Sequence, residues 1–327
     1  IQERKLAKPE PLDRQSDAAI ENEFVHVRFA NGALDVYDKV TRHTYAGLHL
    51  VEDDADRGDA WDFSEPWVPQ PMLCSADFPT TCRLAERGPV RATLELATAM
   101  RVPRRLEGER RSRQQVALPL VARVSVSRGA RRVDVSLCID NQACDHRLRL
   151  QCPTGLRSTT VLSQGHFGLM RRPLRNPDEG KTGWSQPPPT TFPFREWVAV
   201  ESARCGLALA CRGLYEYESR DSGAGVDLYV TLQRGYGRMS RANLKARPGA
   251  ASPAVPTPGA QCLGTRTYEY SFVPYTAGKD GDGAPFMPQV LAFLYPPIAH
   301  QADATHILVD PRITRSKASG AVRTPAW

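Results

Sequence analysis

The residues with the most chemical potential form a run of carboxylates around Trp61. Asp53, Asp54, Asp56 and Asp59 follow one another closely in the chain, and hard cations such as Ca²⁺ prefer clustered carboxylate oxygens. Their spacing, however, does not reproduce a D-x-D-x-D-G loop with its distal Glu. We therefore predict that this segment does not hold a metal ion.

Histidine and cysteine, the usual zinc ligands, also lack a metal-binding arrangement. None of the seven histidines lies in an HxD or HExxH pattern, and none of the eight cysteines lies in a CxxC pair. The even number of cysteines permits disulfides. Cys138, Cys205 and Cys211 lie in apolar strand-like segments, however, where a free thiol behaves as a small hydrophobe. We predict no structural zinc site and mostly free cysteines.

The composition is that of a soluble globular protein with excess positive charge. The 327 residues are 41% hydrophobic, and 43 basic against 36 acidic residues give a formal charge of +7. Arginine clusters at 104–105, 110–113, 131–132 and 171–172 fall mainly in predicted turns with acidic residues scattered among them, which favours solvated loops over a polyanion site. No apolar run, signal peptide or N-x-S/T sequon is found, so we predict a cytoplasmic protein without a nucleic-acid or membrane partner.

Strand signals dominate the chain. Asn31-Gly32 is predicted to join strands at 24–29 and 33–37, because both residues tolerate the positive φ of a type I′ turn. A second turn is expected at Asp38-Lys39, followed by an acidic loop around Trp61. Further strands are predicted at 91–100, 121–127, 132–140, 197–201, 206–211, 227–232 and 267–273. Many short strands separated by Gly, Pro, Asn and Asp indicate an all-β fold, a large antiparallel β-sandwich.

Helical signals are nearly absent. Pro285 and Pro288 limit the one candidate helix, at 285–294, to two turns at most. Residues 176–194 and 247–259 are rich in proline and are predicted as long surface loops of one sandwich. We divide the chain into a polar N-terminal segment at 1–20, a β-sandwich domain at 21–310 and an irregular tail at 311–327. Because the first residue is Ile rather than Met, we expect a processed or excised piece.

A series of short motifs resembles the C-terminal β-sandwich region of glycoside hydrolase family 38, the α-mannosidases. In chain order they are an NEF strand (22–24), a D-K-x-T turn (38–41), a GD-aromatic-x-F loop (58–63), a DN-x-A-x-DHRLR strand (140–149), an FG-x-x-x-RP element (167–173), a strand pair (196–217), an LxR…SR…RPG block (232–249) and a TPGAQ…EY close (257–270). The resemblance covers residues 20 to 310. Each motif is short, but their occurrence in this order along the chain makes the resemblance specific.

This resemblance implies a galactose-mutarotase-like supersandwich fold. Family 38 enzymes are retaining mannosidases with a catalytic zinc and an Asp nucleophile, and both belong to an N-terminal α/β barrel half. A retaining glycosidase needs two carboxyl groups about 5 Å apart. By this resemblance the chain is the non-catalytic half, with no catalytic residue and no zinc of its own, and it is inactive alone. The family also continues beyond residue 311, so we expect a truncated or altered C-terminus.

The resemblance also implies a substrate-binding role for four residues. Asp59, Trp61 and Asp62 occupy the GD-aromatic-x-F loop, where the family more usually has Tyr at the position of Trp61. Trp keeps a ring face for sugar C–H groups but offers only an N–H donor. Arg234 lies in the LxR block, where its guanidinium can grip a substrate oxygen. The alternatives are that Trp61 and Phe63 anchor the loop in the core, and that Arg234 is a salt-bridged interface residue.

Three other functions stay open. The chain can be a stand-alone carbohydrate-binding module with its sugar site at Trp61. It can be a mutarotase-like epimerase, which needs an acid–base pair in one cleft, with His166 and either Glu196 or Glu218 as partners. It can also bind polyanions. The leading hypothesis gives it two partners, a mannose-containing carbohydrate and an N-terminal catalytic barrel of the same enzyme, and leaves a homo-oligomer open.

Overall fold

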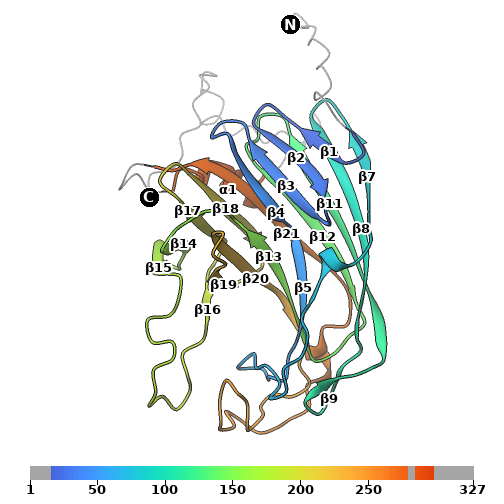
Figure 1. The fold of residues 1–327 in the computed structure, drawn as a ribbon, viewed down its shortest axis with the longest axis vertical. Coiled ribbons are helices and arrows are strands. Elements are labelled where there is room, and N and C mark those ends of the chain that lie inside the picture. The colour runs from blue at the N-terminus through green and yellow to red at the C-terminus, as the bar shows by residue number, and fades with distance from the viewer. Residues whose placement is uncertain (1–15, 279–283, 298–327) are drawn as a thin grey trace, which may run out of the picture. The chain divides into compact units, whose positions relative to one another are not determined.

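The computed structural model describes residues 16–278 and 284–297, and the fold below is that of the compact unit that ends at Tyr295. All pairings between named strands are antiparallel (Figure 1). The predicted all-β class and the large antiparallel β-sandwich are therefore confirmed.

The largest sheet has nine strands. In spatial order they are β15 (Leu169–Pro173), β14 (Thr160–Gln164), β17 (Trp197–Glu201), β18 (Cys205–Arg212), β21 (Gly264–Thr276), β12 (Val133–Asn141), β11 (Gln115–Ser127), β8 (Arg91–Pro103) and β7 (Thr80–Arg87). β11 and β12 alternate buried and more exposed residues along most of their length, so one of their faces is buried. β18 is buried on both faces, because α1 (Met287–Leu294) packs on its second side.

The other layer is built from two smaller sheets. One contains β16 (Thr191–Pro193), β19 (Glu216–Asp221), β20 (Val226–Arg234), β13 (His146–Pro153), β5 (Leu50–Ala55) and β6 (Leu73–Cys74). The other contains β1 (Ala19–Glu21), β2 (Val25–Ala30), β3 (Ala33–Asp38) and β4 (His43–Leu48). A separate ribbon pairs β9 (Leu106–Glu107) with β10 (Arg110–Arg111).

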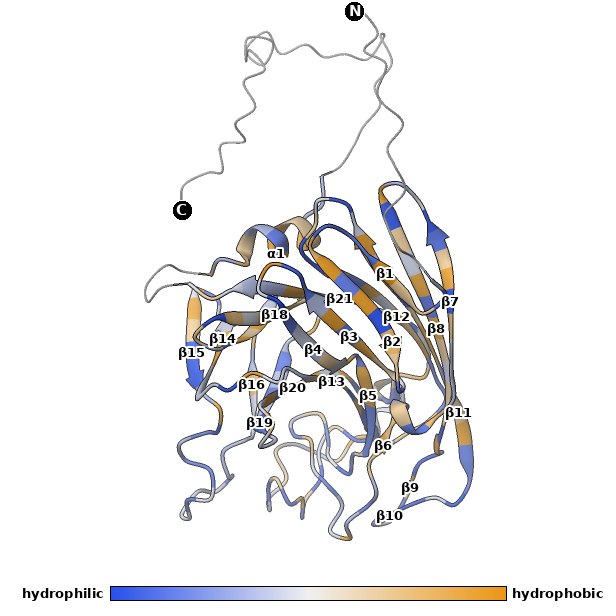
Figure 2. Cartoon of the chain, turned by 45° about the horizontal axis from the view of Figure 1, so that its top comes forward, coloured by the Kyte–Doolittle hydropathy of each residue, from blue (hydrophilic) through white to orange (hydrophobic). Residues whose placement is uncertain are grey.

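One hydrophobic core lies between these layers. Buried side chains of β2, β3, β5, β13 and β20 form a single cluster with those of β8, β11, β12 and β21. The alternation of apolar and polar positions that produces it is visible along the strands in Figure 2. Burial of this apolar surface is the main force that holds the two layers together.

The N-terminal hairpin confirms the local prediction. β2 and β3 pair in register around Asn31 and Gly32, whose φ angles are +52° and +75°. A turn follows β3 at the predicted Asp38-Lys39 position, but it leads into β4, a strand that the sequence did not predict. The other predicted strands exist as well, and most are longer than predicted; β8 and β11, for example, each extend to 13 residues.

Three boundaries differ from the prediction. β5 includes the three carboxylates from Glu52 to Asp54, so the acidic loop begins later than expected. This strand is stable because arginines of β13 neutralise it: Arg149 lies 2.9 Å from Glu52, and Arg147 lies 3.5 Å from Asp54. β16 lies within the predicted loop at 176–194, and Ile20, predicted in the polar segment, is fully buried in β1.

Among the described residues the one α-helix is α1 (Met287–Leu294), which reaches the two turns predicted as its maximum length. Phe286 and Val290 pack with Trp197 and Tyr275 in a second hydrophobic cluster on β17, β18 and β21. Within the ranges given above, no helix has the length and apolarity that a membrane span requires. Residues 1–15 of the predicted N-terminal segment and the tail predicted at 311–327 lie outside the described residues.

Candidate functional site

The Trp61 loop, defined here as residues 56–64, follows β5 and contains a tight turn. The Asp59 carboxylate accepts hydrogen bonds from the N–H groups of Trp61 and Asp62 at 3.0 and 3.1 Å, and the Asp59 N–H donates to the Asp62 carbonyl at 3.0 Å. A side chain at Gly58 would place its Cβ 2.0 Å from that same carbonyl oxygen. The turn therefore requires a short acceptor side chain at 59 and a glycine at 58.

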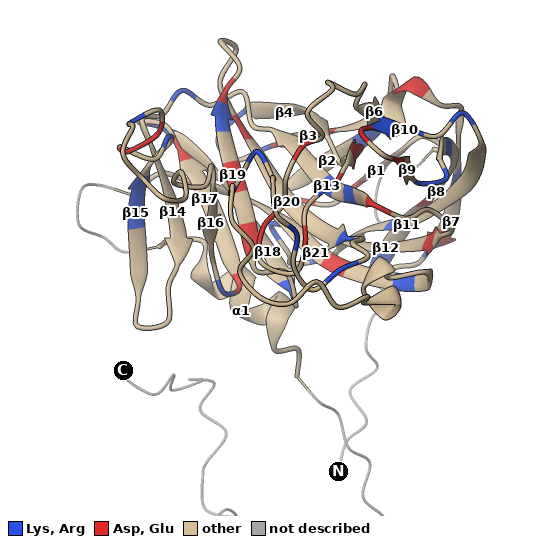
Figure 3. Cartoon of the chain, turned by 90° about the horizontal axis from the view of Figure 1, so that it is seen from below, with Lys and Arg blue, Asp and Glu red and all other residues tan. Residues whose placement is uncertain are grey.

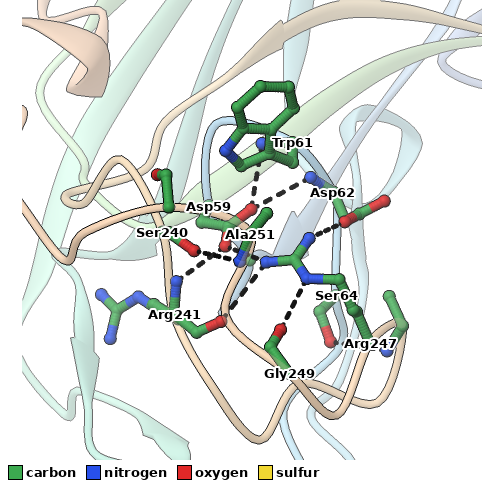
Figure 4. Close-up of polar contacts among 12 residues, drawn as sticks. Asp59, Trp61, Asp62, Ser64, Ser240, Arg241, Arg247, Gly249 and Ala251 are labelled. Carbon is green, nitrogen blue, oxygen red and sulfur yellow. Dashed lines mark hydrogen bonds and ion pairs between the residues drawn. The ribbon is translucent and has the colours of Figure 1, made fainter. Parts of the chain in front are cut away.

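Arg247 binds this turn from the proline-rich segment that follows β20 (Figure 4). Its Nη2 lies 2.6 Å from Oδ2 of Asp59, its Nη1 pairs with Asp62, and its Nε donates to the Gly249 carbonyl at 2.7 Å. The Arg241 N–H also donates to Asp59, at 2.7 Å. Burial raises the pKa of Asp59, but the hydrogen bonds from Arg241 and Arg247 outweigh it and hold that pKa below its usual value. Asp59 is thus a fixed carboxylate.

Arg234 binds the other side of the same loop. Its Nε lies 2.7 Å from the Asp56 carboxylate, and its Nη2 donates to the carbonyls of Asp59 and Asp62 at 3.0 and 2.8 Å. Burial lowers the pKa of Arg234, and Asp56 more than restores it. Within the described part of the chain, Nη1 has no hydrogen-bond partner. Arg234 is therefore salt-bridged, as the alternative predicts, while its place at an interface and its substrate-binding role both stay predictions.

Trp61 and Phe63 have different environments, so the prediction that both anchor the loop is wrong for one of them. Trp61 is 60% exposed. Phe63 is half-buried, and the Cζ atom of Arg147 lies 3.3 Å from its ring centroid, a cation–π contact. Phe63, Arg234 and Arg247 therefore hold the loop, while most of the Trp61 side chain stays exposed.

The structure brings all four predicted site residues into one loop assembly. A second loop joins them, since the Gln186 side chain donates to the Asp62 carboxylate at 2.6 Å. Trp184, two positions earlier, is 54% exposed. Exposed indole rings of this kind suit the C–H faces of sugars or a protein partner.

The carboxylates that suggested a cation site are engaged by basic side chains. Asp53 pairs with Arg111, and its Oδ1 lies 2.6 Å from Nδ1 of His146. Among the residues that the structure describes, no group of three or more His, Cys, Asp or Glu side chains is placed to hold a metal ion. The zinc ion that the family resemblance implies is assigned to the N-terminal half and stays a prediction. The carboxylates of Asp53, Asp56 and Asp59 already bind guanidinium or imidazole groups of this chain.

The epimerase partners lie in different environments. His166 lines a pocket whose other lining residues include no carboxylate. Glu196 accepts a hydrogen bond from the Tyr295 hydroxyl, and Glu218 is buried between Arg149 and Arg220. These contacts leave His166 without either predicted partner in its pocket, so the structure gives the epimerase hypothesis no support.

The arginine clusters are largely neutralised by neighbours. Arg131 pairs with Asp38 at 2.7 Å and Arg171 with Glu201 at 3.2 Å. Figure 3 shows basic and acidic positions interspersed over strands and loops rather than separated into one basic stripe. All eight cysteines are free, and three of them are buried.

Arg247 and Asp56 are the site residues that the sequence prediction did not assign. Arg247 belongs to the RPG motif, which supports the family resemblance but to which the sequence analysis gave no function. Asp56 was considered only as a cation ligand. Their partners are 188 and 178 positions away in the chain, so only the spacing of family motifs could have indicated that they meet.

Comparisons with known proteins match most of this chain. The model of the glycosyl hydrolases family 38 C-terminal domain matches residues 20–237, more than half of the chain. A Halalkalibacterium halodurans protein named "Putative mannosylglycerate hydrolase" is 26% identical over 289 residues, which cover 82% of this chain and 30% of that protein.

Two solved structures from Enterococcus faecalis share the fold. A protein in glycosyl hydrolase family 38 aligns with a TM-score of 0.72 at 23% identity, over 85% of this chain and 32% of that one. An α-mannosidase from strain V583 aligns with a TM-score of 0.71 at 23% identity, over 84% and 31%. The chain thus spans about a third of the length of these relatives. It belongs to glycosyl hydrolase family 38 and contains that family's C-terminal domain.

Proposed function

We propose that this chain is the non-catalytic C-terminal portion of an α-mannosidase-type glycoside hydrolase, which cleaves α-mannosidic bonds by a retaining mechanism in the intact enzyme. The Trp61 loop forms one wall of the sugar pocket. The observation that carries this proposal is the combination of an exposed Trp61 ring with a loop fixed by two arginines. A rigid aromatic platform costs little conformational entropy when a sugar binds.

In this proposal the zinc ion and the nucleophile belong to an N-terminal barrel, which packs against the loop assembly. The carboxylates of Asp53, Asp56 and Asp59 support that division of roles, because each is committed to an arginine. Trp61 and Nη1 of Arg234 then contact the mannose-containing substrate. The eight free cysteines favour a reducing compartment, so we place the protein in the cytoplasm.

Two assays test the proposal. The chain alone, incubated with an aryl α-mannoside with and without zinc, is expected to release no phenol. A protein that combines this chain with the proposed N-terminal barrel is expected to hydrolyse the same substrate. Zinc-dependent hydrolysis by the chain alone would contradict the assignment of the catalytic groups to the other half.

A stand-alone carbohydrate-binding module is the second candidate, and the exposed Trp61 ring favours it equally. The two candidates differ in what the chain does without a partner. Titration of the chain with mannose or mannosylglycerate, followed by tryptophan fluorescence, should show saturable quenching for a module. The quenching should disappear in Trp61→Ala. A chain that needs the barrel to complete its pocket should give no saturable response.

A further inference from the structure

A pocket of about 340 Å³ lies at the end of the nine-stranded sheet, beside β14, β15 and β16. Its size is at the lower end of the ~300–1,000 Å³ range of small-molecule sites. The lining residues that matter here are Gln164, His166, Arg172, Phe194, Arg195 and Tyr215. None of them belongs to the Trp61 loop or contacts it through a hydrogen bond, so a function of this pocket goes beyond the proposed one.

Two arginines line the pocket, and no carboxylate is among its lining residues. Arg172 is held by hydrogen bonds from Nη1 to the Ser163 hydroxyl and the Pro193 carbonyl, both at 3.0 Å. Its guanidinium also lies over the Phe192 ring, 5.4 Å from the centroid. Arg195 is exposed. Neither arginine forms an ion pair within the described ranges, whereas most other arginines of the sheets do.

A polar atom at the pocket lacks a partner. The side-chain Oε1 of Gln164 is buried and accepts no hydrogen bond from the described residues. Leaving such a group unsatisfied costs about 1–3 kcal/mol, and native structures rarely retain one without a reason. A ligand hydroxyl can donate and accept, so it would satisfy the Gln164 amide in either orientation.

The remaining walls are aromatic. Phe194 is 5% exposed and forms an apolar surface at the base, while Tyr215 is 63% exposed at the rim. The Tyr215 ring offers a face for ligand C–H groups, and the guanidinium groups of Arg172 and Arg195 offer hydrogen-bond donors for an anion. A simple inorganic anion would use the arginines but leave the Gln164 amide and the ring face unused.

We propose that this pocket binds a small polyhydroxylated organic anion, such as a sugar acid or a sugar phosphate. The anionic group lies between Arg172 and Arg195, a hydroxyl meets Gln164, and the carbon skeleton packs against Tyr215. His166 adds a further donor at the entrance. A carboxylate and a phosphate can both satisfy the two guanidinium groups, so the experiment must separate these two sources.

Isothermal titration calorimetry of the chain with glucuronate, glucose 6-phosphate and glucose tests the proposal, because the three probes share one ring. We expect saturable binding of at least one of the two anions, at least about tenfold tighter than that of glucose, and weaker at higher salt. The anion that binds more tightly shows whether the pocket prefers a carboxylate or a phosphate. Arg195→Gln should weaken that binding about tenfold, which is the loss of one charge-assisted contact.

Arg101→Gln is the matched control. Arg101 is also exposed, but it lies on β8, outside the pocket, so the variant removes the same charge and should leave the affinity unchanged. Because Arg195 has no structural partner, its variant should fold normally. The proposal is wrong if neither anion binds, if glucose binds as tightly as the anions, or if both variants lose affinity equally.

Discussion

Arg247 and Asp59, 188 positions apart in the chain, form a buried ion pair with 2.6 Å between Nη2 and Oδ2. The same guanidinium also binds Asp62, so one side chain fixes both ends of the turn that presents Trp61. In the sequence the loop is only a series of acidic residues. In the structure, Arg247 binds two of these carboxylates and so fixes the turn that carries the Trp61 ring.

Removing the guanidinium should therefore destabilise the domain. Arg247→Met keeps an unbranched side chain of similar reach but leaves Asp59 buried without its charged partner, which typically costs about 3 kcal/mol. Urea unfolding measures the difference. Arg83→Met is the control, because Arg83 pairs with Glu95 at the surface and exposed pairs contribute about 0–1 kcal/mol. Equal losses in the two variants would contradict a special role for Arg247.

Two glycines of the same assembly should respond differently to a methyl group. Gly58→Ala forces a contact of 2.0 Å with the Asp62 carbonyl, while a Cβ at Gly249 meets nothing within 4 Å. We expect Gly58→Ala to lower the free energy of unfolding by about 2 kcal/mol or more, and Gly249→Ala to change it by less than about 0.5 kcal/mol. Thermal or urea unfolding of both variants, compared with the parent, decides the point.

The core histidine should make stability depend on pH. His49 is buried, its Nδ1 lies 2.5 Å from the Tyr270 hydroxyl, and burial lowers its pKa from 6.5 to about 4. The unfolded chain therefore binds a proton at a higher pH than the folded one. Neutral His49 therefore contributes to the free energy of unfolding. This contribution is fully present above about pH 6.5 and falls by up to roughly 3 kcal/mol as the pH drops towards 4.

The variant that isolates this effect is His49→Asn. His49 has a φ of +67°, a conformation that Asn tolerates better than most residues, and Asn does not titrate. The difference in unfolding free energy between parent and variant should shrink as the pH falls from 6.5 to 4, since the other titrating groups cancel. A difference that is constant over this range would show that His49 is already charged in the folded state.

The sequence predicted local structure better than the site. The hairpin at Asn31-Gly32 follows from two adjacent residues, and the strand class follows from alternation, so both could be predicted. Glu52 and Asp54 were assigned to a loop, because carboxylates are rare in buried strands unless basic side chains neutralise them. Those side chains, Arg149 and Arg147, come from β13, about a hundred residues later.

The sequence could not show that Phe63 is the buried anchor of the loop while Trp61 is exposed. Both are aromatic residues of one loop, and only the packing of Arg147 over Phe63 shows which ring is the anchor. The four residues chosen from the family motifs, Asp59, Trp61, Asp62 and Arg234, do lie together in the structure. Which of those residues touches a sugar remains a prediction.

Because Trp61 is exposed and Phe63 is the anchor, the two variants should separate function from folding. Trp61→Ala is expected to leave the free energy of unfolding of the chain within about 0.5 kcal/mol of the parent. Phe63→Ala should lower it by about 2 kcal/mol, since it removes the ring under Arg147. Denaturant unfolding followed by circular dichroism measures both. A large loss of stability in Trp61→Ala would assign that ring to the core instead.

The most direct measurement is kcat/KM of the intact enzyme on an aryl α-mannoside, compared between the parent, Trp61→Ala and Trp67→Ala. Trp67 is the matched control, because it is exposed to a similar extent but its indole N–H is bound to the Asn243 carbonyl at 3.0 Å. We predict a loss of about tenfold or more for Trp61→Ala, the worth of one stacking face, and an unchanged value for Trp67→Ala. An unchanged kcat/KM in Trp61→Ala would contradict the assignment of this loop to the sugar pocket.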